Sequence, residues 1–390
     1  MFSDSRPRRD TTNCINARQG DTPLIKYLSI GIDKHYAITP LDGSGCGPWY
    51  AYNGYSLARL IYYYVLVSRD FSFVLKEING RTVLEWMIHC TDYGLSGDSD
   101  DLLDYGINDN LLELENTKNY EHYVPSPNGE RYWAYKAIAM LAKAAGKDYS
   151  RLLAKADLIK KLIKDKLWNK EEQWLCCLDK EGKRKTAYSI QIFDLLRTGV
   201  LDDEMEQGIL THLNEREFLS RHGVHSLAKT DPGYYAADMD WSGPGIYAGD
   251  VEIIEDLYKS NHPQAAEDIL KRVLWWGERM PYYPQAIRAD VIDYRRSSNE
   301  GINGRANCIA GPCAAQGIIW GMFGLEMHLS GEITINPRPP SLSKRIALKG
   351  LGVWNKKLDI EADRNSFSVK VDNKTIVSNI GKALTLNLFA

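Results

Sequence analysis

The feature that most constrains the fold is a change in hydrophobic period near residue 331. From about residue 50 to 330, apolar residues recur with helical spacing, in paired segments separated by polar loops. After Gly331, apolar and polar residues alternate with period two between Pro, Gly and Asn turns, which is typical of β-strands. The sequence therefore predicts a helical domain followed by a small β domain.

The expected elements follow from this pattern. Helices are expected at 56–69, 71–78, 82–91, 131–146, 149–167, 188–198, 202–213, 250–260, 263–279 and 306–329. Strands are expected at 333–335, 345–348, 358–361, 366–371 and 384–388. Short connections favour antiparallel helical hairpins. Three long loops, at 92–130, 216–249 and 282–305, interrupt the helices, and such loops in a compact domain are usually functional.

Charge and cysteine usage exclude several classes of function. The 390 residues carry 48 Lys and Arg against 51 Asp and Glu, so no general electrostatic attraction to nucleic acid or to a membrane is expected. The first residues, MFSDSRPRRD, lack the apolar stretch of a signal peptide. The chain as written is thus expected in the cytoplasm, or in the periplasm or medium if its N-terminus is truncated. Seven scattered cysteines without a Cys-x-x-Cys pair favour buried thiols, and we expect no metal and no cofactor.

The first long loop is rich in carboxylates. Most of them are interpreted as solvated or helix-capping groups. Asp104 and Asp109, however, lie among Tyr105, Gly106 and leucines instead of in a charged run. Because apolar surroundings raise the pKa of a carboxyl group, these two are candidates for a general acid that works near neutral pH.

Aromatic residues in loops point to a sugar ligand. The chain has 23 Tyr and 10 Trp, side chains whose flat apolar faces and polar rims suit the stacking of sugar rings. Many of them fall in predicted helices, where core packing is the better interpretation. A minority lies in loops beside carboxylates, within 49–52, 234–247 and 282–294.

Glycoside hydrolysis requires this set of residues. An inverting enzyme uses one protonated carboxyl group and one carboxylate about 6.5–9.5 Å apart, on opposite sides of the scissile bond. The sequence contains no G-x-S-x-G nucleophile elbow, no phosphate-binding glycine loop and no H-E-x-x-H motif, which disfavours the competing chemistries.

The order of several segments resembles the six-hairpin, (α/α)6-toroid glycosidases, in particular the clan of glucosidase I-like and trehalase-like inverting enzymes. Tyr105-Gly106-Ile107-Asn108-Asp109-Asn110 is similar to the clan's Ser-Gly-x-Asp-Asn motif, and Trp241-Ser242-Gly243-Pro244 to its Trp-Arg-Gly-Pro motif. The segments NGERYWAYKAIAMLAKAAGKD, LWNKEEQWLCCLD and FLSRHGVHSLAKTDPGYY resemble passages of its hairpins, and ITINPRPPSLSKRIALKGL resembles a β-sandwich tail. The resemblance implies a mainly α toroid and gives the role of general acid to Asp109.

Two positions depart from the family pattern. Ser242 stands where an Arg is expected, and Gln285 stands in the segment that normally supplies the general base. A neutral amide cannot act as a base. Glu300 is the favoured replacement, with Asp290 and Glu252 as alternatives.

The sequence thus predicts an N-terminal extension or truncated start at 1–30, an (α/α)6-toroid catalytic domain at 31–330 and a β domain at 331–390. The predicted function is inverting hydrolysis of an oligosaccharide or glycoconjugate, with Asp109 as the acid and Glu300 as the base. The expected substrate contacts are Trp49, Tyr52, Asp104, Asn110, Trp241, Gly243, Tyr247, Tyr283, Gln285 and Arg288.

Two rival functions remain open. Gln285 is consistent with a carbohydrate-binding or degenerate relative that lacks a working carboxylate pair. A toroid polysaccharide lyase would instead use Tyr294 and the arginines Arg288, Arg295 and Arg296 against a uronic acid.

Overall fold

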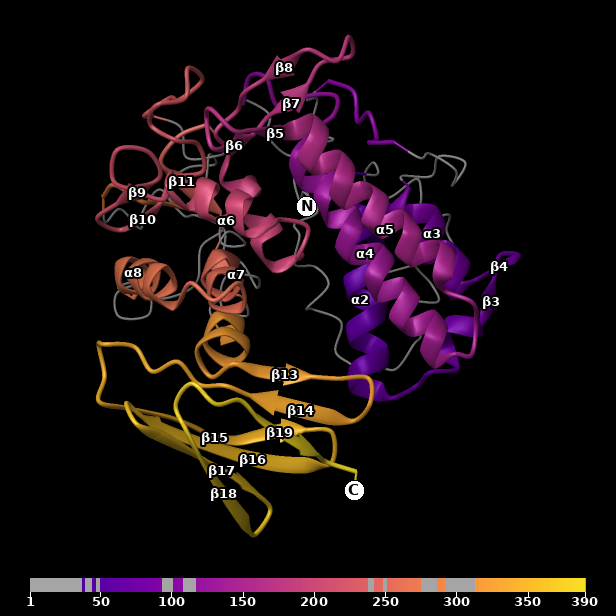
Figure 1. Ribbon diagram of the computed structural model, residues 1–390, viewed down its shortest axis with the longest axis vertical. Coiled ribbons are helices and arrows are strands. Elements are labelled where there is room, and N and C mark those ends of the chain that lie inside the picture. Colours follow the sequence, from indigo (N-terminus) through magenta and orange to yellow (C-terminus); the bar gives the residue numbers. More distant parts are fainter. Residues whose placement is uncertain are drawn as a thin grey trace.

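The computed structural model describes residues 37–38, 44–46, 50–92, 101–107, 117–237, 242–247, 251–274, 286–291, 313 and 315–389. Within these residues, five helical segments follow one another around the inside of a ring (Figure 1). They are α2 (Asn53–Ser68), α4 (Pro125–Ala144), the 3₁₀ helix η5 (Ile190–Arg197), α7 (Ile253–Lys259) and the π-helix η7 (Gly317–Met322). Each packs against the next in this order.

A second layer of helices covers the outside of the ring. Helix α3 (Val83–Thr91) packs on α2 and α4, α5 (Ser150–Leu162) on α4, α6 (Asp203–Leu210) on η5, and α8 (Pro263–Val273) on α7. Helix α5 continues as a π-helical turn, η4 (Ile163–Leu167). Inner and outer helices alternate along the chain, which is the arrangement of an α/α toroid and confirms the predicted fold class.

Glycines bring two inner elements into close contact. A Cβ atom at Gly317 would lie 3.2 Å from Cγ2 of Ile254, and one at Gly321 would lie 2.9 Å from Cδ2 of Tyr258. Since both contacts advance by four residues in the same direction, α7 and η7 run parallel. A side chain at either glycine would push them apart.

Two of the expected helices are wrong. The segment 71–78 forms a short 3₁₀ turn, η3 (Phe73–Leu75), and then the strand β3 (Glu77–Ile78), which pairs with β4 (Arg81–Thr82). Asn79 and Gly80 have positive φ angles of 50° and 75°, which a tight hairpin turn requires.

The last expected helix, 306–329, ends early in its described part. Element η7 stops at Met322, and β13 (Leu325–Met327) follows after Gly324. Gly324 has φ 59°, and a Cβ there would lie 2.2 Å from the carbonyl oxygen of Asn336. Only glycine fits both conditions, and it allows the chain to leave the helix and enter the sheet at this point.

The start of α4 also differs from the prediction. The helix begins at Pro125 and not at 131. The run Pro-Ser-Pro-Asn-Gly has the composition of a loop, so the sequence placed the start too late. Pro is nevertheless compatible with the first turn of a helix.

Two antiparallel sheets form the C-terminal part. Strands β13, β14 (Glu332–Ile335) and β19 (Leu384–Asn387) make one sheet. Strands β15 (Arg345–Val353), β16 (Lys356–Asp363), β17 (Ser366–Val371) and β18 (Lys374–Asn379) make the other in sequence order. Strand β18 lies outside the prediction. It is an edge strand with no buried side chain, so the apolar alternation that marks the other strands is weak there.

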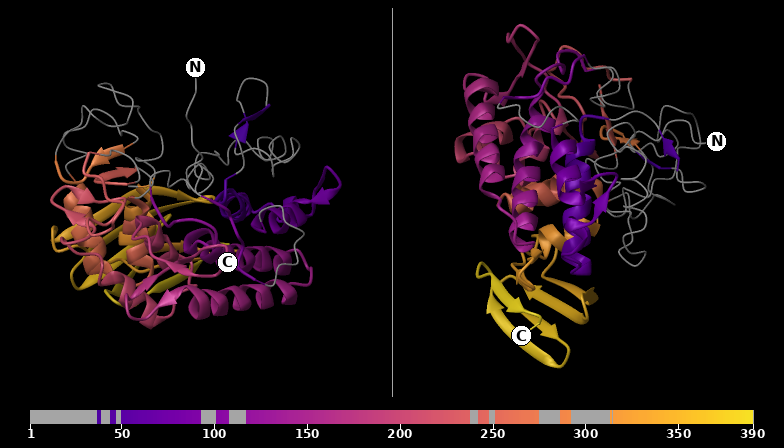
Figure 2. Two further views of the ribbon diagram at one scale, coloured as in Figure 1. Left: turned by 90° about the horizontal axis from the view of Figure 1, so that it is seen from above. Right: turned by 90° about the vertical axis from the view of Figure 1, so that its right-hand side faces the viewer.

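The sheets lie against the C-terminal end of α2, below the helices in the right-hand view of Figure 2. Trp354 Nε1 donates a hydrogen bond of 2.9 Å to the carbonyl of Leu66. Arg69 donates to the carbonyl of Leu329 at 2.7 Å and stacks on Trp354 and Phe389.

Short hairpins occupy the loops. They are β1 (Ala37–Ile38) with β2 (Gly45–Cys46), β5 (Trp168–Asn169) with β6 (Trp174–Leu175), β7 (Cys177–Leu178) with β8 (Arg184–Lys185), β9 (Leu219–Ser220) with β10 (Gly223–Val224), and β11 (Gly245–Tyr247) with β12 (Ala286–Arg288). The long loops at 216–249 and 282–305 therefore contain strands where they are described. Cys176 and Cys177 are both buried and do not bridge each other. None of the helices in the described ranges is long and apolar enough to cross a membrane.

Candidate active site

The starts of three inner helices meet at one end of the ring. The Tyr52 hydroxyl, just before α2, donates a hydrogen bond to Oε1 of Gln191 at the start of η5 and lies 3.2 Å from the Tyr120 hydroxyl. Ser126 Oγ, at the start of α4, donates to the carbonyl of Gln191 at 2.8 Å. Tyr52 is itself buried, so the described structure gives it a positioning contact, and its predicted contact with substrate stays a prediction.

The first acidic loop is fixed to this end of the ring. The Leu103 N–H donates to Asn128 Oδ1 at 2.8 Å, and the Tyr105 N–H donates to the His122 carbonyl at 3.0 Å. Asp104 Oδ1 lies 2.9 Å from His122 Nδ1, and Asp104 is 39% exposed. Its surroundings are therefore more polar than the sequence suggested, although its neighbours Leu103 and Tyr105 are buried.

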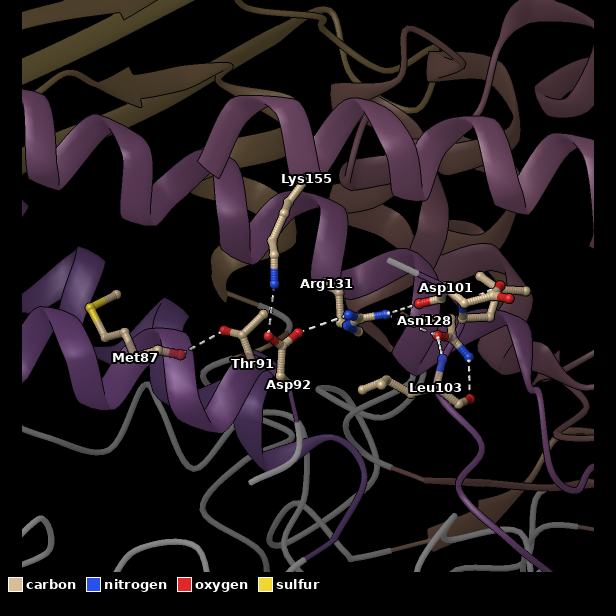
Figure 3. A network of polar contacts seen from close by, with 9 residues as sticks. Met87, Thr91, Asp92, Asp101, Leu103, Asn128, Arg131 and Lys155 are labelled. Carbon is tan, nitrogen blue, oxygen red and sulfur yellow. Dashed lines mark hydrogen bonds and ion pairs between the residues drawn. The ribbon is translucent and has the colours of Figure 1, made fainter. Parts of the chain in front are cut away.

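A buried ion network connects Asp92 to the backbone of Asp101, at the start of the next described segment. Asp92, at the end of α3, receives Arg131 Nη2 at 2.8 Å and Lys155 Nζ at 3.3 Å (Figure 3). Arg131 Nη1 also donates to the Asp101 carbonyl at 3.3 Å. Asp92 is fully buried, and burial together with its charge raises the pKa of Tyr135. The network ties α3, α4 and α5 to the base of the acidic loop.

The second long loop reaches the same end of the ring. The Ile190 N–H, at the start of η5, donates to the carbonyl of Ser226 at 2.9 Å, and Ser226 Oγ donates to the carbonyl of Gly245 in β11. A Cβ at Gly233 would lie 3.7 Å from the backbone nitrogen of Lys118, which belongs to the first loop. The second loop is thus adjacent to the first.

Strand pairing adds the third loop. Gly245 pairs with Arg288 and Tyr247 with Ala286. The Arg288 guanidinium binds Asp290 at 2.8 and 2.5 Å and donates to the Ala236 carbonyl at 3.1 Å. All three loops predicted from carboxylates and aromatics therefore meet in the fold.

Burial shifts the pKa values of His225 and Asp231 in this region. Burial lowers the pKa of His225 to about 4, with a further contribution from Lys229, and His225 Nδ1 lies 3.2 Å from the Tyr234 hydroxyl. Burial raises the pKa of Asp231, although it accepts backbone hydrogen bonds from Tyr188 and Gly233. His225 is a neutral hydrogen-bonding group at neutral pH.

The alternative general bases have different environments. Glu252 is almost fully buried and paired with Arg59 and Arg197, so water has no direct access to it. Asp290 is one-third exposed. Burial acts to raise its pKa, but hydrogen bonds from Arg288 lower the pKa below its usual value. An ionised, accessible carboxylate fits a base better, so among these two Asp290 is the stronger alternative.

The remaining predicted residues are only partly described. Gly243 is buried in the second loop, and for Tyr247 the structure describes the backbone alone. The following predicted residues lie outside the described ranges: Trp49, Asp109, Asn110, Trp241, Tyr283, Gln285 and Glu300. No group of three or more His, Cys, Asp or Glu among the described residues could hold a metal ion.

A second buried cluster, inside the ring, was not predicted as a unit. Arg197 Nη1 binds Glu252 Oε2 and lies 3.3 Å from Asp256 Oδ1, and Arg197 Nε lies 3.1 Å from the Tyr55 hydroxyl. Burial raises the pKa of Asp256 to about 8, against the lowering effect of Arg197. Acidic residues at helical spacing in the predicted helix 250–260, at Glu252, Glu255 and Asp256, are the signal that could have found it.

Comparison with known proteins agrees with this architecture. Residues 97–245, fewer than half of the chain, match the family model of the mannosylglycerate hydrolase MGH1-like glycoside hydrolase domain. A solved structure described as a sialidase matches with a TM-score of 0.68 and 15% identity over 86% of this chain and 32% of its own. The helical domain has the six-hairpin glycosidase fold.

A second solved structure shares this fold. A GH78 family rhamnosidase of Bacillus sp. GL1 matches with a TM-score of 0.50 and 17% identity, over 82% of this chain and 30% of its own. The chain thus spans about a third of the length of these two structures, and at such identities they establish the fold alone. None of the curated proteins matches the chain in sequence.

Proposed function

We propose that the protein is a glycoside hydrolase that cleaves an oligosaccharide or glycoconjugate with inversion at the anomeric carbon. The observation that carries the proposal is the meeting of the three acidic and aromatic loops at one end of a six-hairpin glycosidase fold. The match to a glycoside hydrolase domain over residues 97–245 supports it, because that region contains most of the first loop and most of the second.

The proposed chemistry uses two carboxyl groups. Asp109 protonates the oxygen of the leaving group, and Glu300 removes a proton from the attacking water on the opposite face of the sugar. The Asp92–Arg131 network fixes the base of the loop that precedes Asp109. If Glu300 is not the base, Asp290 is the next candidate.

The proposed substrate contacts are the residues predicted from sequence. Trp49, Trp241, Tyr247 and Tyr283 offer faces for sugar rings, and Asp104, Asn110, Gln285 and Arg288 offer hydrogen bonds. Arg288 donates two hydrogen bonds to Asp290, so fewer of its N–H groups are available to hold the carboxylate of a uronic acid. This favours hydrolysis over the lyase reaction.

The test is an activity screen of the full chain on aryl glycosides and reducing oligosaccharides. We expect Asp109→Asn and Glu300→Gln each to lower kcat/KM by a factor of about 10²–10⁴, the usual contribution of a general acid or base. The matched control is Asp157→Asn, an exposed carboxylate on the outer helix α5, which should keep wild-type activity.

Each other outcome contradicts a specific part of the proposal. Full activity of Asp109→Asn would remove the acid assignment. A first product with retained anomeric configuration in ¹H NMR would exclude inversion, and a product with an unsaturated, ultraviolet-absorbing ring would indicate a lyase. Sugar binding without turnover on any substrate would indicate a binding protein.

A further inference from the structure

A cavity lies at the other side of the inner helices, between them and the sheet β13-β14-β19. Its volume is about 440 Å³, which is within the range of about 300–1,000 Å³ usual for small-molecule sites. The lining comes from α2, α4, η5, α7 and η7 on one side and from β13 and β14 on the other. None of the residues predicted to act in catalysis or to bind substrate lines it.

Aromatic side chains form one wall of this cavity. Tyr62, Tyr63, Trp133 and Trp320 line it and are all partly exposed. The rings of Tyr62 and Trp133 meet edge to face with centroids 5.7 Å apart, and those of Tyr62 and Tyr63 do so at 5.6 Å. Edge-to-face contacts hold the rings in fixed orientations and leave faces for a flat or ring-shaped ligand.

Two arginines line the cavity. Arg197 has a side chain only 5% exposed, its Nη1 is paired with Glu252 and its Nη2 is buried from solvent, so Arg338 is the guanidinium that a ligand can reach. Arg338 is half-buried and forms no ion pair with the described residues. Burial lowers the pKa of Arg338, so an anionic ligand would relieve the cost of desolvating its charge.

Two of the other polar lining residues have partners. Lys259 is paired with Glu255 at 2.5 Å, and His328 Nε2 lies 2.9 Å from Thr334 Oγ1. Glu326 is the carboxylate in the lining. One guanidinium without a counterion, beside aromatic faces, matches a ligand with a sugar ring and a single planar carboxylate, because a guanidinium binds a carboxylate through two parallel hydrogen bonds.

We propose that this cavity binds a carbohydrate that carries a carboxylate, such as a uronic acid unit, with the carboxylate on Arg338 and the ring against the aromatic wall. The site is separate from the proposed catalytic end. The proposal does not depend on hydrolysis.

The test is a titration of the full chain with D-glucuronate, followed by tryptophan fluorescence because Trp133 and Trp320 line the cavity. We expect a saturable change in the wild type and at least tenfold weaker binding in Arg338→Gln. Arg345→Gln is the matched control: Arg345 pairs with Glu361 on the four-stranded sheet, and its loss should leave the affinity unchanged.

A second variant tests the sign of the charge effect. Glu326→Gln removes the lining carboxylate and should strengthen glucuronate binding about threefold, by removing a repulsive charge. This variant keeps the test decisive if Arg338→Gln fails to fold.

Four results would overturn the proposal. They are no saturable change, equal affinity for D-glucose, tighter binding of glucose 6-phosphate than of glucuronate, or wild-type affinity in Arg338→Gln. Asp109→Asn should bind glucuronate as the wild type does, so loss of binding in that variant would place the ligand at the catalytic end instead.

Discussion

Two buried networks of the ring are both made of arginine or lysine and carboxylate side chains, but they differ in which sign of charge is in excess. At the base of the acidic loop, one carboxylate, Asp92, is held by two cations, Arg131 and Lys155. Inside the ring, Arg59 and Arg197 face two carboxylates, Glu252 and Asp256, and the charge of Glu130 also acts on Arg197. The first network is rich in positive charge and the second in negative charge.

The difference teaches how a buried ion cluster reaches neutrality. In the first network two cations compensate the charge of one buried carboxylate. In the second cluster, burial and the neighbouring carboxylates raise the pKa of Asp256, which favours its protonated form. The second network is therefore expected to respond to pH.

The largest expected effect is at Asp92. Asp92→Asn keeps the shape of the side chain but removes the charge that Arg131 and Lys155 share, which should lower the free energy of unfolding by about 3–5 kcal/mol. Urea unfolding at pH 7 measures it, with the exposed Asp157→Asn as control. A loss below 1 kcal/mol would show that the two networks do not differ.

A smaller effect is expected at Lys155. Lys155→Met keeps an unbranched side chain but removes the ammonium group that lies over the Tyr135 ring and forms the longer of the two ion pairs, while Arg131 still pairs with Asp92. The expected loss is about 1.5–3 kcal/mol, the value of a hydrogen bond to a charged group. The same urea series measures it, and a loss equal to that of Asp92→Asn would mean that Arg131 does not compensate the carboxylate.

The smallest effect is expected at Asp256. Below about pH 4 the carboxyl group of Asp256 is protonated in the unfolded chain as well as in the folded protein, so Asp256→Asn replaces one neutral group by another and should change the free energy of unfolding by less than about 1 kcal/mol. Its Oδ1 atom can still accept from Arg197.

The pH dependence of Asp256 has a definite sign. A folded-state pKa of about 8 against an ordinary value of 3.8 means that the native protein keeps a proton which the unfolded chain releases between these values. The stabilising contribution is complete below pH 4 and is lost as the pH rises to 8, at up to about 1.4 kcal/mol per pH unit. Asn does not titrate, so the variant should gain stability relative to the wild type from pH 5 to pH 8. A constant difference between the two unfolding curves would refute the protonated state.

The grouping of the three loops could be predicted because loops with function carry a composition of their own, whereas the roles of the individual site residues stay predictions. Asp104, Gly243 and Arg288 were selected from clusters of acid, aromatic and glycine, and the fold brings their loops together through Ser226, Lys118 and the β11–β12 pairing. The burial of Tyr52 could not be predicted, because its hydroxyl bonds to Gln191, on a helix 139 residues away along the chain.

The periodicity of the sequence by itself determined that a helical region is followed by a β region, since both periods are local properties of the chain. It also determined which loops contain carboxylates and aromatics. Only the tertiary structure decided that Asp92 and Asp256 have opposite electrostatic surroundings, because a charge responds to every group packed around it, whatever the separation along the chain. The cavity beside Arg338 was decided in the same way, by helices and strands that meet only in the fold.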